Sequence, residues 1–207
     1  MKKLSAIAGL LFIAVSLFGQ GARDFETEIT DGNVTITGYT GTEKNVRIPE
    51  KIHTMTVVSI GEFAFAEKQL TGVYIPPGVT SIGDGAFYGN RIKNIIIPHG
   101  VTSIGIVAFS KNEINSLIIP NTVTHIGIGA FSDNRIKSIT IPNSLTSIEN
   151  GVFSDNEIRN VTIPNSVTTI GMYAFYNNKI TNVRLPNSIT STGEYAFSTE
   201  NHLKFTI

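Results

Sequence analysis

The stretch Leu70–Asn90, LTGVYIPPGVTSIGDGAFYGN, decides the fold, because the chain repeats it every 22 residues until it ends. Two unrelated residue types keep this interval. The phenylalanines are Phe65, Phe87, Phe109, Phe131, Phe153, Phe175 and Phe197. The prolines are Pro76, Pro98, Pro120, Pro142, Pro164 and Pro186. A period of about 20 to 50 residues predicts a solenoid, in which each copy forms one turn and packs on its neighbours.

Two apolar columns predict one short strand in every turn. They alternate around a variable residue, which is strand periodicity, and proline ends the strand. The first column is Val73, Ile95, Leu117, Ile139, Val161 and Val183, and two residues later come Ile75, Ile97, Ile119, Ile141, Ile163 and Leu185. Parallel strands stack about 4.8 Å apart, so the sequence predicts one continuous sheet along the molecule.

The second half of each turn predicts the opposite wall of the core. Its isoleucines are Ile60, Ile82, Ile104, Ile126, Ile148 and Ile170, and an Ala-Phe pair follows in every turn except Val152-Phe153. We interpret the phenylalanines as a stacked core ladder, with an aromatic ligand site as the alternative.

Glycine and asparagine also recur once per turn. Glycine follows the isoleucine, which we interpret as a backbone bend, and Glu149 departs from this column. Asparagine recurs at Asn90, Asn112, Asn134, Asn156 and Asn178. We expect its amide to bind backbone groups of the neighbouring turn.

The consensus LxxΦxΦPxxΦTxIGxxAFxxN, in which Φ is apolar, resembles the BspA-type leucine-rich repeats of bacterial surface proteins over about residues 46–207. In size and layout the chain is similar to treponemal members of this family. The resemblance implies a right-handed solenoid of about seven turns with a concave parallel sheet. It also implies a binding or adhesin role at the cell surface, with host matrix proteins and epithelial cells among the targets.

Composition excludes several function classes. The chain has 207 residues, of which 16 are basic and 16 acidic, so no strong field attracts nucleic acid. It has no cysteine, which excludes disulfides and thiolate chemistry.

Residues 1–21 predict a secretory signal peptide. Lys2 and Lys3 precede an apolar run from Leu4 to Phe18, and small or polar residues follow. The run is shorter than the roughly 20 residues of a membrane span, although an uncleaved anchor is the alternative. We therefore predict an exported chain, in the periplasm, on the outer surface or secreted, with no membrane span after cleavage.

Residues 22–45 predict an N-terminal β-hairpin cap around Asp31-Gly32, and residues 46–207 the solenoid. The apolar residues expected to cover the first turn are Phe25, Ile29, Val34 and Ile36. Pro49 and Pro76 lie 27 residues apart, so five residues are inserted within 50–57, as a bend or a second small hairpin. At the other end Phe205 and Ile207 return to the strand columns, which predicts a final strand with an open edge.

The variable columns carry the candidate binding residues. The outward residues of the strands are Tyr74, Ile96, Ile118, Thr140, Thr162 and Arg184, with the small polar Asn94 and Ser116 beside them. The apolar third of this column predicts a surface for a protein partner or for self-association, while strand propensity alone is the alternative.

Charged columns lie next to these residues. Lys93, Lys137, Arg159 and Arg184 form a basic strip that an anionic ligand could use. A column of alternating sign predicts exposed ion pairs along the stack: Arg91, Glu113, Arg135, Glu157 and Lys179.

Catalytic and metal-binding patterns are missing from the sequence. The histidines His53, His99, His125 and His202 occupy unrelated repeat positions, and no nucleotide or nucleophile motif occurs. We predict an exported protein-binding module that is not an enzyme and uses no cofactor or metal. The alternative is a structural protein that associates with itself through the apolar strip or the terminal edge strand, and a hydrolase or lectin is the weakest hypothesis.

Overall fold

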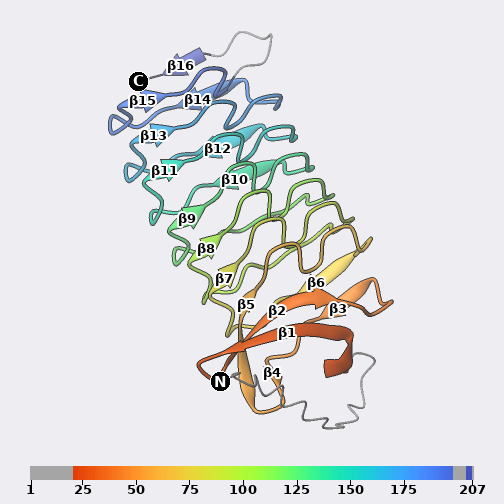
Figure 1. The fold of residues 1–207 in the computed structure, drawn as a ribbon. Coiled ribbons are helices and arrows are strands. Elements are labelled where there is room, and N and C mark those ends of the chain that lie inside the picture. The colour runs from red at the N-terminus through yellow and green to blue at the C-terminus, as the bar shows by residue number, and fades with distance from the viewer. Residues whose placement is uncertain (1–20, 198–203, 207) are drawn as a thin grey trace, which may run out of the picture.

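A computed structural model describes residues 21–197 and 204–206 (Figure 1). Short strands stack in about seven turns, and a 3-10 turn, η1 (Ala22–Asp24), is the one helical element among these residues. The mainly-β solenoid predicted from the repeat is confirmed. Residues 1–20 of the predicted signal peptide lie outside the described part, as does His202.

The N-terminal strands form the predicted hairpin. Strand β1 (Phe25–Thr30) pairs antiparallel with β2 (Asn33–Tyr39). Strand β2 then pairs in parallel with β5 (Met55–Ile60), so the hairpin lies on the first turn of the solenoid (Figure 1). The five inserted residues form a second hairpin, because β4 (Lys51–Ile52) turns back onto β5.

One predicted cap residue is wrong. Phe25, Val34 and Ile36 are buried, but the side chain of Ile29 is 54% exposed. Ile29 pairs with the buried Val34, so their side chains share one face of the hairpin, and the bulge between Glu26 and Thr27 does not explain the exposure. Because β1 is the edge strand, we attribute the exposure to its position at the margin of the core, where Phe25 is its one buried residue.

Tyr39, and not Ile29, helps to cover the first turn of the solenoid. Its ring is buried and stacks on Phe65 with the ring centroids 5.6 Å apart. Burial raises the pKa of its hydroxyl, which donates a hydrogen bond to the carbonyl of Glu43. The aromatic stack of the solenoid therefore continues into the cap.

A ladder of short strands runs along one wall. From β5 it passes through β7 (Ser81–Ile82), β8 (Ser103–Ile104) and β9 (His125–Ile126), and it resumes with β11 (Ser147–Ile148), β13 (Thr169–Ile170) and β15 (Ser191–Thr192). The sequence did not predict these strands, because two residues are too few to show alternation.

The predicted strands form the opposite wall, which we call the strand face. Strand β3 (Asn45–Arg47) pairs with β6 (Gly72–Tyr74), β10 (Ser138–Thr140) with β12 (Asn160–Thr162), and β14 (Asn182–Arg184) with β16 (Lys204–Thr206). A single bridge joins Asn94 to Ser116. The final strand is confirmed, but the prediction of one continuous sheet is wrong, because the described strands of this face pair two by two.

The phenylalanine rings form one stack through the core. Ring centroids from Phe65 to Phe197 are 5.1 to 5.8 Å apart and the rings are nearly parallel. Their spacing does not follow the strand pairing, because it is 5.1 Å between Phe175 and Phe197, whose turns carry the unpaired β12 and β14. The rings are all buried, which confirms their interpretation as core.

The asparagine column joins consecutive turns. The buried amide of Asn112 donates to the carbonyls of Phe87, Phe109 and Ser110, and its oxygen accepts the backbone N–H of Ile92. The other four asparagines make the corresponding bonds, which confirms the predicted role.

The glycine column has a different role from the predicted bend. The glycines that follow the isoleucines do not have positive φ. A Cβ on Gly105 would instead lie 2.5 Å from the backbone nitrogen of Asp84 in the preceding turn. Glycine is therefore required because two backbones approach closely.

Glu149 shows the effect of losing this glycine. Gly127 N–H donates to Ile104 and Gly171 N–H to Ile148, whereas no such bond joins Glu149 to Ile126. The wall ladder is interrupted at this point, between β9 and β11. The widest ring spacing, 5.8 Å, lies at the same junction, between Phe131 and Phe153.

Candidate functional site

The outward column of the strand face carries the most exposed apolar side chains among the described residues. Ile96 is 84% exposed, Ile118 79% and Tyr74 38%. The residues on either side of Ile96, Ile95 and Ile97, are only 5% and 4% exposed. We call Tyr74, Ile96 and Ile118 the apolar strip. Large aliphatic side chains in this position add nothing to the core.

Tyr74 forms the margin of the strip. The guanidinium carbon of Arg47 lies 4.1 Å from its ring centroid, because β3 and β6 are paired in register. A cation–π contact of this kind covers one face of the ring. Ile96 and Ile118 are thus the open part of the strip.

A cavity of about 410 Å³ adjoins the two isoleucines. Its lining is mostly apolar, and His99, Asn94 and Ser116 supply the polar atoms. The strip and the cavity together make an uneven apolar surface across two turns.

The remaining residues of the predicted surface are all exposed. Thr140, Thr162 and Arg184 continue the outward column, and Asn94 and Ser116 lie beside the strip. Lys93, Lys137 and Arg159 are also exposed, and no ion pair is recorded for them in the described part of the chain. They lie in one repeat column, so the strand face has a basic margin.

The column of alternating charge forms ion pairs at two of its steps. Arg135 lies 3.4 Å from Glu113, and Lys179 lies 3.4 Å from Glu157. Exposed pairs of this kind contribute about 0 to 1 kcal/mol each. These ion pairs join neighbouring turns of the solenoid and are not part of a binding site.

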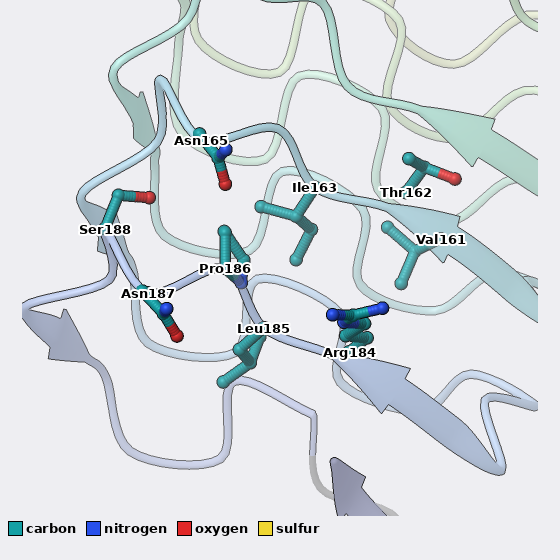
Figure 2. A pocket seen from close by; sticks show the side chains of 9 residues that line it. All are labelled: Val161, Thr162, Ile163, Asn165, Arg184, Leu185, Pro186, Asn187 and Ser188. Atoms are coloured by element: carbon teal, nitrogen blue, oxygen red, sulfur yellow. The ribbon is translucent and has the colours of Figure 1, made fainter. Parts of the chain in front are cut away.

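A second cavity on the strand face was not predicted (Figure 2). It has a volume of about 590 Å³ and lies between the turns of β12 and β14. A third, of about 490 Å³, lies between the row of Ile118 and β10. Both occur where neighbouring strands are not joined by a ladder. The repeat pattern could not reveal them, since it describes each turn and not the spacing between turns.

An exposed tyrosine cluster on another wall was also missed. Tyr173 stacks on Tyr195 with centroids 5.4 Å apart and packs edge-on against Tyr176. Tyr173 and Tyr195 have positive φ, in a column where Gly129 and Gly151 also have positive φ. The replacement of glycine by tyrosine at this repeat position was the available signal.

The exposed histidines do not come together. His53, His99 and His125 lie on different turns, and the structure shows no cluster of three or more His, Cys, Asp or Glu side chains among the residues it describes. Within the same residues, no helix has the length and apolar character needed to cross a bilayer.

Comparisons with known proteins agree with this geometry. The family described as BspA type Leucine rich repeat region matches residues 43–158 and 126–207, with six copies. A leucine rich cell surface protein from Faecalibacterium prausnitzii is 30% identical with a TM-score of 0.75. That alignment covers 89% of this chain and 52% of the other, so the chain spans about half of that protein.

Two further structures share the fold. The T. pallidum leucine rich repeat protein is 20% identical with a TM-score of 0.55, over 84% of this chain and 85% of that one. The pneumococcal vaccine antigen PcpA is 22% identical with a TM-score of 0.53, over 87% of this chain and 46% of that one. A search of the curated proteins found no match.

Proposed function

Because the chain belongs to the BspA-type leucine-rich repeat family, we propose that it is an exported, non-enzymatic module that binds a protein partner in an adhesin-like role. The F. prausnitzii relative is a cell surface protein, which supports export. So does the sequence of residues 1–21, in which two lysines precede an apolar run.

The exposure of Ile96 and Ile118 carries the proposal. Their side chains are 84% and 79% exposed on consecutive rows, while their sequence neighbours form the core. Both side chains line one cavity, and clustered exposed apolar side chains mark interaction surfaces more often than isolated ones do. The fold does not need them, because the same column holds Thr140 and Thr162 in later turns.

The charge around the strip defines the partner's chemistry. Lys93, Lys137 and Arg159 border the outward column, and Arg184 lies in it. A complementary partner presents an apolar patch with acidic side chains at its edge, since opposite charges at the rim favour association. We expect such a surface on a host matrix protein or a cell-surface protein.

The test is binding of the mature chain to immobilised matrix proteins and to epithelial cells. Replacing Ile96 and Ile118 together with lysine should weaken binding at least about thirtyfold, as for loss of an interface hot spot. The matched control replaces Ile106 and Ile128, an exposed pair on adjacent rows of another wall, with lysine. The control should bind like the wild type. If both double variants bind equally, the strip is not the contact, and if the wild type binds neither target, the adhesin-like role is wrong.

The alternative is a structural protein that associates with itself. In the described residues β16 pairs only with β14, so its other edge is available for a second copy. The apolar strip is the second candidate surface. Sedimentation over a range of concentrations separates the two functions, because a monomer at all concentrations excludes self-assembly.

A further inference from the structure

The cavity between β12 and β14 combines an apolar floor with polar ends (Figure 2). Two consecutive turns line it. The residues of the β12 turn are Val161, Thr162, Ile163 and Asn165, and those of the β14 turn are Arg184, Leu185, Pro186, Asn187 and Ser188. Its volume of about 590 Å³ is in the range of about 300–1,000 Å³ that is typical of small-molecule sites.

The floor consists of core positions that are opened to solvent. Val161 and Leu185 belong to the two apolar strand columns but are only half-buried. The equivalent residues one turn earlier, Ile139 and Ile163, are 4% and 7% exposed. No ladder joins β12 to β14, and this missing contact leaves apolar area that a ligand can cover.

The polar groups lie on opposite sides of this floor. In Figure 2 Arg184 lies at the end near β14, and Asn165, Asn187 and Ser188 lie at the other end, with Ile163 and Pro186 between them. The Ser188 hydroxyl donates to the carbonyl of Val167 at 2.7 Å, which leaves its oxygen free to accept.

Among the residues that the structure describes, Arg184 is the only charged one that lines the cavity. No ion pair is recorded for its guanidinium within the described part of the chain. A guanidinium binds a carboxylate through two parallel hydrogen bonds. A single cation matches one negative charge, so a ligand with several phosphates is not expected.

We propose that this cavity binds a short aliphatic chain with a carboxylate at one end and an amide at the other. The carboxylate lies on Arg184, the aliphatic chain covers Ile163 and Leu185, and the amide reaches Asn165 or Asn187. An N-acylated ω-amino acid shares this chemistry with the carboxyl terminus of an apolar peptide, in which an upstream amide takes the far end. The proposal is independent of the apolar strip, which lies on the rows of Ile96 and Ile118.

The neighbouring cavity of about 490 Å³ provides an internal comparison. It has the same construction one repeat pair earlier, but Thr140 stands where Arg184 stands in the larger cavity. It lacks the cation, and its floor is less open, because Leu117 and Ile141 are 6% and 2% exposed where Val161 and Leu185 are half-buried. Threonine already fits this column at 140 and 162, so Arg184→Thr removes the cation with a residue that the fold accepts.

The experiment is a titration of the ¹⁵N-labelled mature chain followed by amide chemical shifts. The probes are N-acetyl-6-aminohexanoate, its carboxamide, and an acetylated tetrapeptide that ends in leucine with a free carboxylate. We expect N-acetyl-6-aminohexanoate or the tetrapeptide to shift the amides of residues 161–163, 165, 184, 185, 187 and 188; Pro164 and Pro186 have no amide proton. Binding by the small acid identifies a free acid as sufficient, and binding by the tetrapeptide alone identifies a peptide terminus.

Two variants decide the role of the cation. Arg184→Thr should weaken binding of the carboxylate probes by about tenfold or more, as for loss of a charge-assisted hydrogen bond. Arg91→Gln removes the same charge from an exposed position outside the cavity, where the column already holds Gln69, and should bind normally. The proposal is overturned if the carboxamide binds as well as the acid, if Arg184→Thr has no effect, or if no probe shifts these amides up to its solubility limit.

Discussion

Gly105 has no room for a side chain, although its backbone conformation would accept one. A Cβ there would lie 2.5 Å from Asp84 N and 2.6 Å from Gly83 C. Gly151 is the opposite case. Its φ is +62°, and an added Cβ would meet only the hydroxyl of Ser154, at 3.7 Å. Substitution of Gly105 therefore tests the effect of crowding, and substitution of Gly151 tests the effect of an unfavourable backbone conformation.

Replacing each of these glycines with alanine should give different losses of stability. Gly151→Ala should cost about 1 kcal/mol or less, because left-handed strain is partly offset by a stiffer unfolded chain. Gly105→Ala should cost about 2–3 kcal/mol, because the backbones of two turns must separate. Denaturant unfolding measures both. A larger loss for Gly151→Ala than for Gly105→Ala would mean that the positive φ of Gly151 matters more for stability than the close approach of the two backbones at Gly105.

Asn112 should be among the most sensitive polar positions. Its buried amide makes four hydrogen bonds to the backbone of two turns. Asn112→Ala leaves these groups without partners and should cost roughly 3 kcal/mol. Asn115→Ala, at an exposed position three residues later, should change stability by less than about 0.5 kcal/mol. Equal losses in denaturant unfolding would show that the asparagine ladder is dispensable.

At the scale of the strand, the interruption at Glu149 is a property of one side chain. The wall ladder runs on both sides of it, from β5 to β9 and from β11 to β15. Phe131 N–H still donates to the carbonyl of Val152 at 2.9 Å, so the turns remain joined at the phenylalanine ladder. The two turns therefore lose the hydrogen bonds of the wall ladder but keep those beside the phenylalanine rings.

Glu149→Gly should restore the ladder across this junction. In the wild type we expect the amide of residue 149 to exchange with solvent faster than those of Gly127 and Gly171, which are hydrogen-bonded. In Glu149→Gly its protection should rise toward theirs. Hydrogen exchange measured by NMR resolves the three amides. Unchanged exchange at residue 149 would mean that the glutamate does not cause the interruption.

Elements differed in how well the sequence predicted them. The hairpin at Asp31-Gly32 and the strands of the strand face were predicted, because turn chemistry and alternation act locally. The two-residue strands and the pairwise joining of the strand face were not, because both depend on contacts between turns, which the sequence of one turn does not show. Ile29 was misplaced because alternation shows which face of a strand a residue is on, but not how far the core extends under an edge strand.

For the whole molecule, the 22-residue period determined the architecture, because it fixes which side chains become neighbours. The candidate surface was predicted only in part. Ile96 and Ile118 were identifiable as apolar residues in an outward column. The cavity at Arg184 was not, because it arises where two turns fail to pair.

The same period divides the chain between folding and binding. Residues in fixed columns pack in the core, and residues between them are free to contact a partner. Ile96 and Ile97 show the division at adjacent positions, with side chains 84% and 4% exposed. Because both residues are isoleucine, a difference in stability between their variants cannot come from the type of side chain that is replaced.

The most direct test is the free energy of unfolding of Ile96→Lys and Ile97→Lys, measured in denaturant under the same conditions. We predict that Ile96→Lys stays within about 0.5 kcal/mol of the wild type, and that Ile97→Lys loses several kcal/mol or does not fold, because it buries a charge. Similar losses in the two variants, or a greater loss for Ile96→Lys, would contradict the division of columns on which the fold and the proposed surface both depend.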